Sequence, residues 1–241
     1  MGYTVVVGAG SGIFGAYRKL APEKEYILMD LPEKIGLLKQ EMESSDCRAV
    51  FFPLDVTDPG AVKDVFASAA EYRVEELVYL AGINCLAEAL DVTEALWDKV
   101  LDTNLKGCFF VMQEAAKNMI RHGTAGRMVN IVSQHAFVGN TERAAYCASK
   151  AAMVGLNRVL ALEWAPFGIR VNSVAPTWIL YPCNEALLMD PGFQRKNLRG
   201  IPLKRYCAPE DVACAVDFLL SGKSRMMTGQ SILLDGGWTI R

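Results

Sequence analysis

Histidine is scarce in this 241-residue sequence, and its cysteines do not form a pattern. The only histidines, His122 and His135, are too few and too far apart for a histidine-rich metal site. The seven cysteines are odd in number and widely spaced, without a C-x-x-C pair, which excludes the usual zinc and disulfide frameworks. We therefore expect no bound metal and free thiols, as in a reducing cytoplasm.

The sequence also lacks a charge excess and a long hydrophobic run. Lys plus Arg total 25 and Asp plus Glu total 27, so a net charge of −2 gives no general attraction to nucleic acid. The longest uncharged stretches, Tyr3–Tyr17 and Val171–Asn184, are too short to span a membrane. No basic stretch precedes the apolar start of the chain, so we expect a cytoplasmic protein without nucleic-acid or membrane partners.

What the sequence does have is enough apolar material for a core, arranged in an alternating order. Hydrophobic residues make up 51% of the chain, which excludes a disordered or fibrous protein. Short apolar runs predict strands at Thr4–Val7, Tyr26–Met29, Ala49–Phe52, Glu76–Leu80, Arg127–Val132, Arg170–Ala175 and Ser231–Leu234. Helical patterns lie between them, most clearly at 97–121 and 146–165. This order predicts one α/β domain over 1–241, a Rossmann-type doubly wound parallel sheet of about seven strands with helices on both faces.

A glycine-rich loop follows the first predicted strand. Gly8 opens it, and Gly10, Gly12 and Gly15 spell G-x-G-x-x-G before a helical stretch. Such a loop lets the backbone approach a pyrophosphate, which then lies at a helix N-terminus. Asp30 ends the next strand, where a carboxylate can accept hydrogen bonds from ribose hydroxyls and repel a 2′-phosphate. Because Leu31 follows it rather than an arginine, we expect NAD rather than NADP.

Four further residues form a candidate proton-transfer group. Tyr146 and Lys150 are spaced i, i+4 and share one face of a predicted helix. Ser133 lies at the carboxyl end of a predicted strand, on the ligand side of a doubly wound sheet. Asn104 lies in the preceding helical pattern.

These residue types suit the oxidation of an alcohol. A Lys150 ammonium and a cationic nicotinamide would lower the pKa of Tyr146 toward working pH, so that its phenolate accepts the alcohol proton. Ser133 can hydrogen-bond the substrate oxygen, and Lys150 can also hold ribose hydroxyls. Asn104 can hold a water that connects Lys150 to solvent.

The chain is identified as resembling the short-chain dehydrogenase/reductase family, in its branch of single-domain chains. The matching segments are the glycine loop, Leu54-Asp55-Val56, Ala81-Gly82, Asn104, Ser133, Tyr146-x-x-x-Lys150, Ile169-Arg-Val-Asn172 with Pro176, Pro209-Glu-Asp-Val212, and Thr228-Gly-Gln with Asp235-Gly-Gly237. Their order and spacing are highly specific. The sequence departs from the family pattern at Val7 and Phe14 in the loop, at Tyr79-Leu80, at Thr177 and at Tyr181.

The resemblance implies a set of cofactor contacts and a quaternary structure. It implies that Asp55 and Val56 flank the adenine and that the backbone of Ile179 meets the nicotinamide carboxamide. It also implies a homotetramer built on the two long helices. The full set of expected cofactor-binding residues is Gly8, Gly10, Gly12, Ile13, Asp30, Leu31, Asp55, Val56, Ala81, Gly82, Tyr146, Lys150, Pro176 and Ile179.

The expected substrate pocket combines three segments: 134–137, 140–143 and a variable lid at 178–206. Several of its residues are polar or charged, which suits a polyhydroxylated or carboxylated substrate. The chain is also similar to bacterial sugar, sugar-acid and polyol dehydrogenases of the family. Reduction of 3-oxoacyl thioesters is an alternative, for which Lys117, Arg121 and Arg127 could form a basic cluster. A dinucleotide-binding sensor or scaffold without turnover is the alternative of another class.

Overall fold

The computed structural model describes residues 2–43 and 47–240; the ends of the predicted domain, Met1 and Arg241, lie outside them. Its centre is a seven-stranded parallel sheet in the order β3-β2-β1-β4-β5-β6-β7. The strands are β1 (Tyr3–Val7), β2 (Glu25–Asp30), β3 (Ala49–Pro53), β4 (Val74–Tyr79), β5 (Arg127–Ile131), β6 (Arg170–Pro176) and β7 (Ser231–Leu234). The predicted doubly wound sheet is therefore confirmed.

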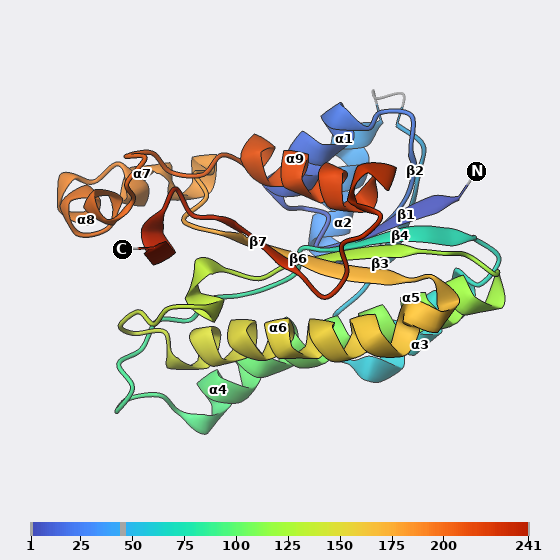
Figure 1. Ribbon diagram of the computed structural model, residues 1–241, viewed down its shortest axis with the longest axis horizontal. Helices are drawn as coiled ribbons and strands as arrows, with labels where there is room; N and C mark the ends of the chain where they lie inside the picture. Colours follow the sequence, from blue (N-terminus) through green and yellow to red (C-terminus); the bar gives the residue numbers. More distant parts are fainter. Residues whose placement is uncertain (1, 44–46, 241) are drawn as a thin grey trace.

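Helices cover both faces of this sheet (Figure 1). On one face lie α1 (Gly12–Leu20), α2 (Pro32–Met42) and α9 (Pro209–Leu220), and on the other α3 (Pro59–Ser68), α4 (Glu94–Leu101), α5 (Gly107–Arg121) and α6 (Ala144–Trp164). Each face has its own buried cluster of apolar side chains. Two short helices, α7 (Glu185–Leu188) and α8 (Pro191–Lys196), project beyond the sheet beside the C-terminal end of the chain.

The long helical pattern at 97–121 is three consecutive segments. Thr93 caps α4, its hydroxyl accepting a hydrogen bond from the backbone N–H of Leu96 at 3.2 Å, so the helix begins before the predicted start. A π-helical turn at Asp102–Lys106 then separates α4 from α5. Such a turn widens the helix by one residue and is frequent at functional sites. Here it contains the fully buried Asn104.

A buried pair of amides joins the two elements that carry Ser133 and Tyr146. Asn130 in β5 donates to Asn157 Oδ1 in α6 at 2.7 Å, and Asn157 donates back to Asn130 Oδ1 at 3.0 Å. Both residues are at most 1% exposed. Since buried amides without partners are strongly unfavourable, this reciprocal pair fixes α6 against the end of β5.

Arg170 at the start of β6 connects this strand to the end of α9 and to the turn before β7. Its guanidinium donates to the carbonyl oxygens of Ser224 at 3.1 Å, Met227 at 3.2 Å, Leu219 at 3.0 Å and Ser221 at 3.2 Å. These carbonyls belong to the end of α9 and the turn before β7. One side chain therefore satisfies acceptors that the helix itself leaves free.

We expect Arg170→Met to lower the free energy of unfolding by at least about 3 kcal/mol, because several charge-assisted hydrogen bonds disappear together. Chemical denaturation measures this change. Arg225 lies in the same turn but is exposed, so Arg225→Met is the control and should change stability by less than about 0.5 kcal/mol. Equal effects of the two variants would contradict the role of Arg170.

Candidate active site

The glycine loop connects the carboxyl end of β1 to the start of α1. Gly8 has a φ of 82°, and a Cβ added there would lie 2.5 Å from the backbone nitrogen of Ala81. Leu80 and Ala81 both donate to the carbonyl of Val7, at 2.8 and 3.1 Å. Only glycine permits this approach of two strand ends, which leaves the loop backbone able to cradle a dinucleotide.

The start of α1 has the features of an anion-binding helix terminus. Ser11 caps the helix, and its hydroxyl accepts from the backbone N–H of the buried Ile13 at 3.2 Å. Gly15, the third glycine of the predicted motif, has no atom within 4 Å of an added Cβ, so nothing packs closely against it. The adjacent Phe14 is 1% exposed and packs edge-to-face on Tyr26. Phe14 rather than Gly15 therefore packs the start of α1 closely against the sheet.

Tyr181 covers this loop from the far end of the chain. A Cβ on Gly12 would lie 2.9 Å from two carbons of the Tyr181 ring. The Tyr181 hydroxyl is hydrogen-bonded to Ser11, and burial raises its pKa to about 12. Asn184 holds the backbone of the same segment, accepting from Tyr181 N at 2.8 Å and donating to the Ile179 carbonyl at 3.0 Å. No sequence pattern predicts this contact between Tyr181 and the glycine loop.

Asp30 lies at the carboxyl end of β2, beside the loop as predicted. Its Oδ2 accepts from Gly10 N at 2.8 Å and its Oδ1 from Leu31 N at 2.8 Å. Lys34, one helical turn later, places its Nζ 3.9 Å from Asp30 Oδ1. Although Leu31 follows Asp30 directly, a basic side chain therefore does lie near this carboxylate. The i, i+4 spacing of Asp30 and Lys34 was the available signal.

The remaining expected cofactor residues line the same edge of the sheet, after β3, β4 and β6. Asp55 caps a turn, accepting from Thr57 N at 2.9 Å, and Val56 is buried against Gly107 at the start of α5. Gly82 lies in the segment after Ala81, where an added Cβ would be 3.3 Å from both Asn104 Oδ1 and Lys150 Nζ. Pro176 ends β6, and Ile179 follows it in a bridge with Cys207.

Tyr146, Lys150 and Ser133 meet at this edge. Lys150 Nζ lies 5.9 Å from the centroid of the Tyr146 ring and donates to the carbonyl of Ile131 at 2.8 Å. The Ser133 hydroxyl hydrogen-bonds Tyr146, and its oxygen also accepts from His135 N at 3.1 Å. The structure thus brings together the three side chains that the sequence singled out on two separate elements.

Asn104 joins this group through its amide. Its Oδ1 accepts from Ile83 N at 2.8 Å, and its Nδ2 donates to Ile83 O at 2.9 Å and to Ser149 Oγ at 3.0 Å. Ser149 immediately precedes Lys150 on α6. The side chain therefore connects the segment after β4 to the helix of Tyr146, rather than facing solvent.

The protonation of the Tyr–Lys pair differs from the expectation in one respect. In this chain, desolvation raises the pKa of Tyr146 above its ordinary value, although the hydrogen bond from Ser133 and the charge of Arg143 oppose the rise. Burial lowers the pKa of Lys150 to about 8. The lower pKa of Tyr146 that we expect from Lys150 and a bound nicotinamide together is therefore not a property of the protein alone, where removal from water dominates.

Aromatic side chains flank Tyr146 on the side away from the glycine loop. The His135 ring lies 6.4 Å from the Tyr146 ring and 5.5 Å from Trp178, and Trp178 packs on Trp238 at 5.0 Å. Trp238, at the C-terminal end, was missed by the sequence reasoning. Within the described parts of the chain, no three His, Cys, Asp or Glu residues are grouped so as to hold a metal ion. Nor is any described helix both long and apolar enough to cross a membrane.

The comparisons with known proteins agree with this geometry. A family model described as enoyl-(acyl carrier protein) reductase matches residues 18–239. The chain is 36% identical to the NAD-dependent glycerol dehydrogenase of Listeria innocua over 242 residues, which cover 98% of this chain and 93% of the relative. It is also 36% identical to the 2-dehydro-3-deoxy-D-gluconate 5-dehydrogenase of Bacillus subtilis, with 98% and 94% covered.

A solved structure extends the match to three dimensions. A 4-hydroxyisoleucine dehydrogenase complexed with NADH superposes with a TM-score of 0.92 at 28% identity, over the whole of both chains. The family model matches most of the chain, and these relatives match nearly all of it, so family membership is established. The chain belongs to the short-chain dehydrogenase/reductase family.

Proposed function

We propose that the protein is an NAD-dependent oxidoreductase that interconverts a secondary alcohol and a ketone on a polyol, sugar or sugar acid. The observation that carries this proposal is the meeting of Tyr146, Ser133 and Lys150 beside a glycine loop at one edge of the sheet. The relatives named above, which include a glycerol and a sugar-acid dehydrogenase, support the substrate class.

In the proposed reaction, the Tyr146 oxygen takes the proton of the substrate hydroxyl. Ser133 donates a hydrogen bond to the same substrate oxygen as it becomes a carbonyl. When bound, NAD would supply the acceptor for the hydride that leaves the substrate carbon. Lys150 stabilises the phenolate through its charge and holds ribose hydroxyls, while Asn104 keeps the helix of Tyr146 in position. In the reverse direction, Tyr146 returns the proton to the ketone oxygen.

The test is a panel of polyols, sugars and sugar acids incubated with the purified protein and NAD. We expect the absorbance of NADH to rise with at least one substrate. A protein that binds NAD but oxidises nothing in the panel would support the other class of function, a dinucleotide-binding sensor or scaffold. The complete Tyr146, Ser133 and Lys150 group argues against that alternative, because binding alone does not need it.

We expect NAD to be preferred over NADP, since the Asp30 carboxylate faces the ribose side of the loop and repels a 2′-phosphate. Asp30→Ala should weaken NAD binding and reduce the preference. The positive charge of Lys34 would attract a 2′-phosphate. Lys34→Met is therefore the matched variant and should increase the preference for NAD over NADP. Dissociation constants of both cofactors for the three proteins measure this. Tighter binding of NADP than NAD by the wild type would contradict the assignment.

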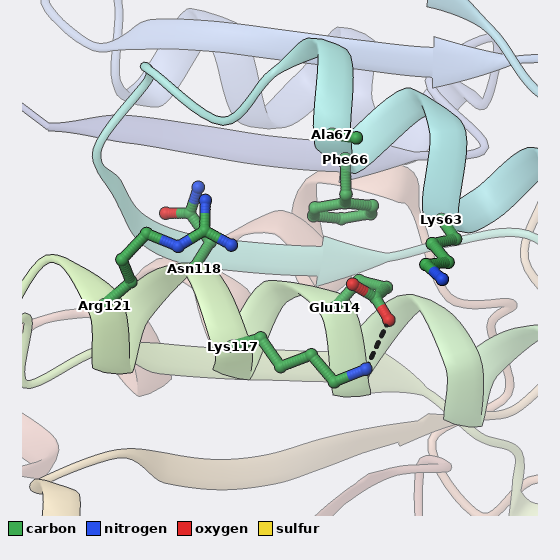
Figure 2. Close-up of a pocket in the computed structure, with 7 residues that line it drawn as sticks. All are labelled: Lys63, Phe66, Ala67, Glu114, Lys117, Asn118 and Arg121. Carbon is green, nitrogen blue, oxygen red and sulfur yellow. Dashed lines mark hydrogen bonds and ion pairs between the residues drawn. The ribbon is translucent and has the colours of Figure 1, made fainter.

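A specific observation bears on the alternative, reduction of 3-oxoacyl thioesters. Lys117 and Arg121 of α5 line a surface hollow of about 140 Å³ together with Lys63 of α3 (Figure 2). Glu114 pairs with Lys117 at 2.6 Å within this hollow. Arg127 is engaged by Glu75 and Glu76 instead, at 3.6 and 3.5 Å. The expected basic cluster is thus only partly present, and we retain polyols and sugar acids as the first choice.

We also propose a homotetramer built on α5 and α6. The apolar side chains of Leu101, Leu105, Phe109 and Leu156 line a hollow of about 470 Å³, together with the charged residues Asp98, Asp102 and Lys106. Leu162, on the same helix α6, is 77% exposed. Apolar surface of this kind typically marks an interface.

Light scattering should therefore give a mass near four times 26.4 kDa. Leu105→Glu should shift it to smaller species, because a charge would be buried in the interface. A wild-type monomer at micromolar concentration would contradict the proposal.

Two further expectations about this single domain belong to the same proposal. Segment 178–206, which contains α7 and α8, would act as a lid over the substrate, because Trp178 packs on His135 at its base. A cytoplasmic location is supported by the seven free cysteines.

A further inference from the structure

We propose that Arg143 binds a carboxylate group of the substrate, so that the physiological substrate is a hydroxy acid or oxo acid rather than a neutral polyol. This inference rests on the proposed function, since it concerns the same site. It goes further because the relatives act on both neutral polyols and sugar acids, and the inference chooses the acids.

The position of Arg143 places it beside the reacting group. It is the residue that precedes α6, with a non-helical backbone (φ −133°, ψ 32°), and it lies three positions before Tyr146 in the chain. The segment after β4 holds the backbone of Arg143 in place: Ala87 forms a β-bridge with Arg143, and Ala87 N donates to the Glu142 carbonyl at 3.1 Å. Glu142 itself has a φ of 63°, an unfavourable backbone conformation for a residue other than glycine. Strain of this kind persists where surrounding contacts hold it, and it is concentrated at functional sites.

The guanidinium of Arg143 is available to a ligand. It is partly exposed, and it donates one hydrogen bond to the Thr141 carbonyl at 3.1 Å. Within residues 2–43 and 47–240, no carboxylate forms an ion pair with it. Its charge nevertheless acts on the site: it lowers the pKa of both Tyr146 and His135. A planar guanidinium with free donors is the group best suited to a carboxylate.

His135 does not compete as a second cation. Burial lowers its pKa to about 4, with the charge of Arg143 acting in the same direction, so the ring is neutral at physiological pH. Its Nδ1 atom is buried without a hydrogen-bond partner, and so are both amide atoms of Gln134. These two residues follow Ser133 directly and are 7% and 1% exposed. Unpartnered buried polar atoms beside a reacting centre are suited to hydroxyl groups of the substrate, while Arg143 supplies the charge.

The test compares acids with alcohols of equal chain length: glycerate with glycerol, xylonate with xylitol, and gluconate with glucitol. We expect the wild type to show the higher kcat/KM on an acid. Arg143→Met should lower kcat/KM for that acid by about 10- to 100-fold more than for the matched alcohol, mainly through KM. Any loss that arises through the pKa of Tyr146 affects both substrates and cancels in this ratio. Arg143→Lys should recover part of the loss. The exposed control Arg225→Met should leave both unchanged.

The outcomes separate this inference from the proposed function. A wild type that prefers a neutral polyol, or an Arg143→Met variant that loses activity equally on acid and alcohol, would overturn the carboxylate assignment and leave the alcohol oxidation intact. A wild type that oxidises neither class would contradict both. Competition provides a second measurement: propionate should inhibit the wild type at least tenfold more strongly than propionamide, and Arg143→Met should remove this difference.

Discussion

Tyr146→Phe should lower turnover by 10² or more while leaving NAD affinity within about twofold of the wild type. The substitution removes only the hydroxyl, which is the proton acceptor hydrogen-bonded to Ser133. The ring that packs near His135, at 6.4 Å, stays in place. Because the lost interaction is made in the transition state, kcat and kcat/KM should fall together. Steady-state kinetics on a substrate that the wild type oxidises measure the effect.

Ser133→Ala is the companion variant for this experiment. It removes a hydrogen bond to the reacting oxygen but keeps the phenol, so its turnover should fall less than that of Tyr146→Phe. Near wild-type turnover of Tyr146→Phe would exclude the phenol as the acid–base group. The rate of alcohol oxidation should rise with pH, because the phenol must lose its proton. The apparent pKa of that rise in the complex with NAD should lie below that of free tyrosine, in contrast to the raised pKa of the protein alone.

Lys150→Met should reduce both turnover and NAD affinity. Lys150 is 4% exposed and its Nζ lies near the Tyr146 ring, so its loss removes the charge that stabilises the phenolate. The same ammonium is expected to hold ribose hydroxyls, which Met cannot do. We expect turnover to fall by 10² or more and the dissociation constant of NAD to rise several-fold. Isothermal titration and steady-state kinetics separate the two effects, and unchanged NAD affinity would contradict the ribose contact.

The lowered pKa of Lys150 also predicts that the stability of the protein depends on pH. Burial lowers the pKa of Lys150 from 10.5 to about 8, so between these values the unfolded chain binds more protons than the folded one. The free energy of unfolding of the wild type should therefore rise with pH across this range, by about 3 kcal/mol relative to Lys150→Met. Groups remote from Lys150 titrate alike in both proteins and cancel in the difference, whereas the pKa of Cys108 depends on the Lys150 charge and contributes to it. A difference that stays constant from pH 8 to 10.5 would contradict the lowered pKa.

The sheet and the reacting group could be predicted from the sequence because both depend on local patterns. The strands are continuous apolar runs, and the structure places their ends within two residues of the predicted positions. Tyr146 and Lys150 share a helix face by spacing alone. Ser133 joins them because the carboxyl ends of parallel strands meet at one edge of the sheet.

The features that could not be predicted depend on contacts between distant segments. Tyr181 follows β6 and Gly12 follows β1, two strands far apart in the sequence, and no local pattern indicates that the Tyr181 ring covers the glycine loop. The raised pKa of Tyr146 follows from desolvation, which only the packed structure determines. Phe14 could replace a packing glycine because Tyr26 lies opposite it in space. The Asp30–Lys34 contact is different, since its spacing was visible and was overlooked.

The position of Tyr181 has a consequence for the kinetic order of the reaction. The Tyr181 ring lies close to Gly12, so we expect a cofactor that binds at the start of α1 to displace it. Tyr181 lies three residues after Trp178, which packs on His135. Because both rings belong to one short segment, we expect displacement of Tyr181 to shift Trp178 on the substrate side as well. Catalysis should follow a compulsory order in which the cofactor enters first and leaves last. Product-inhibition patterns should then show the reduced cofactor competing with NAD, while the ketone does not compete with NAD.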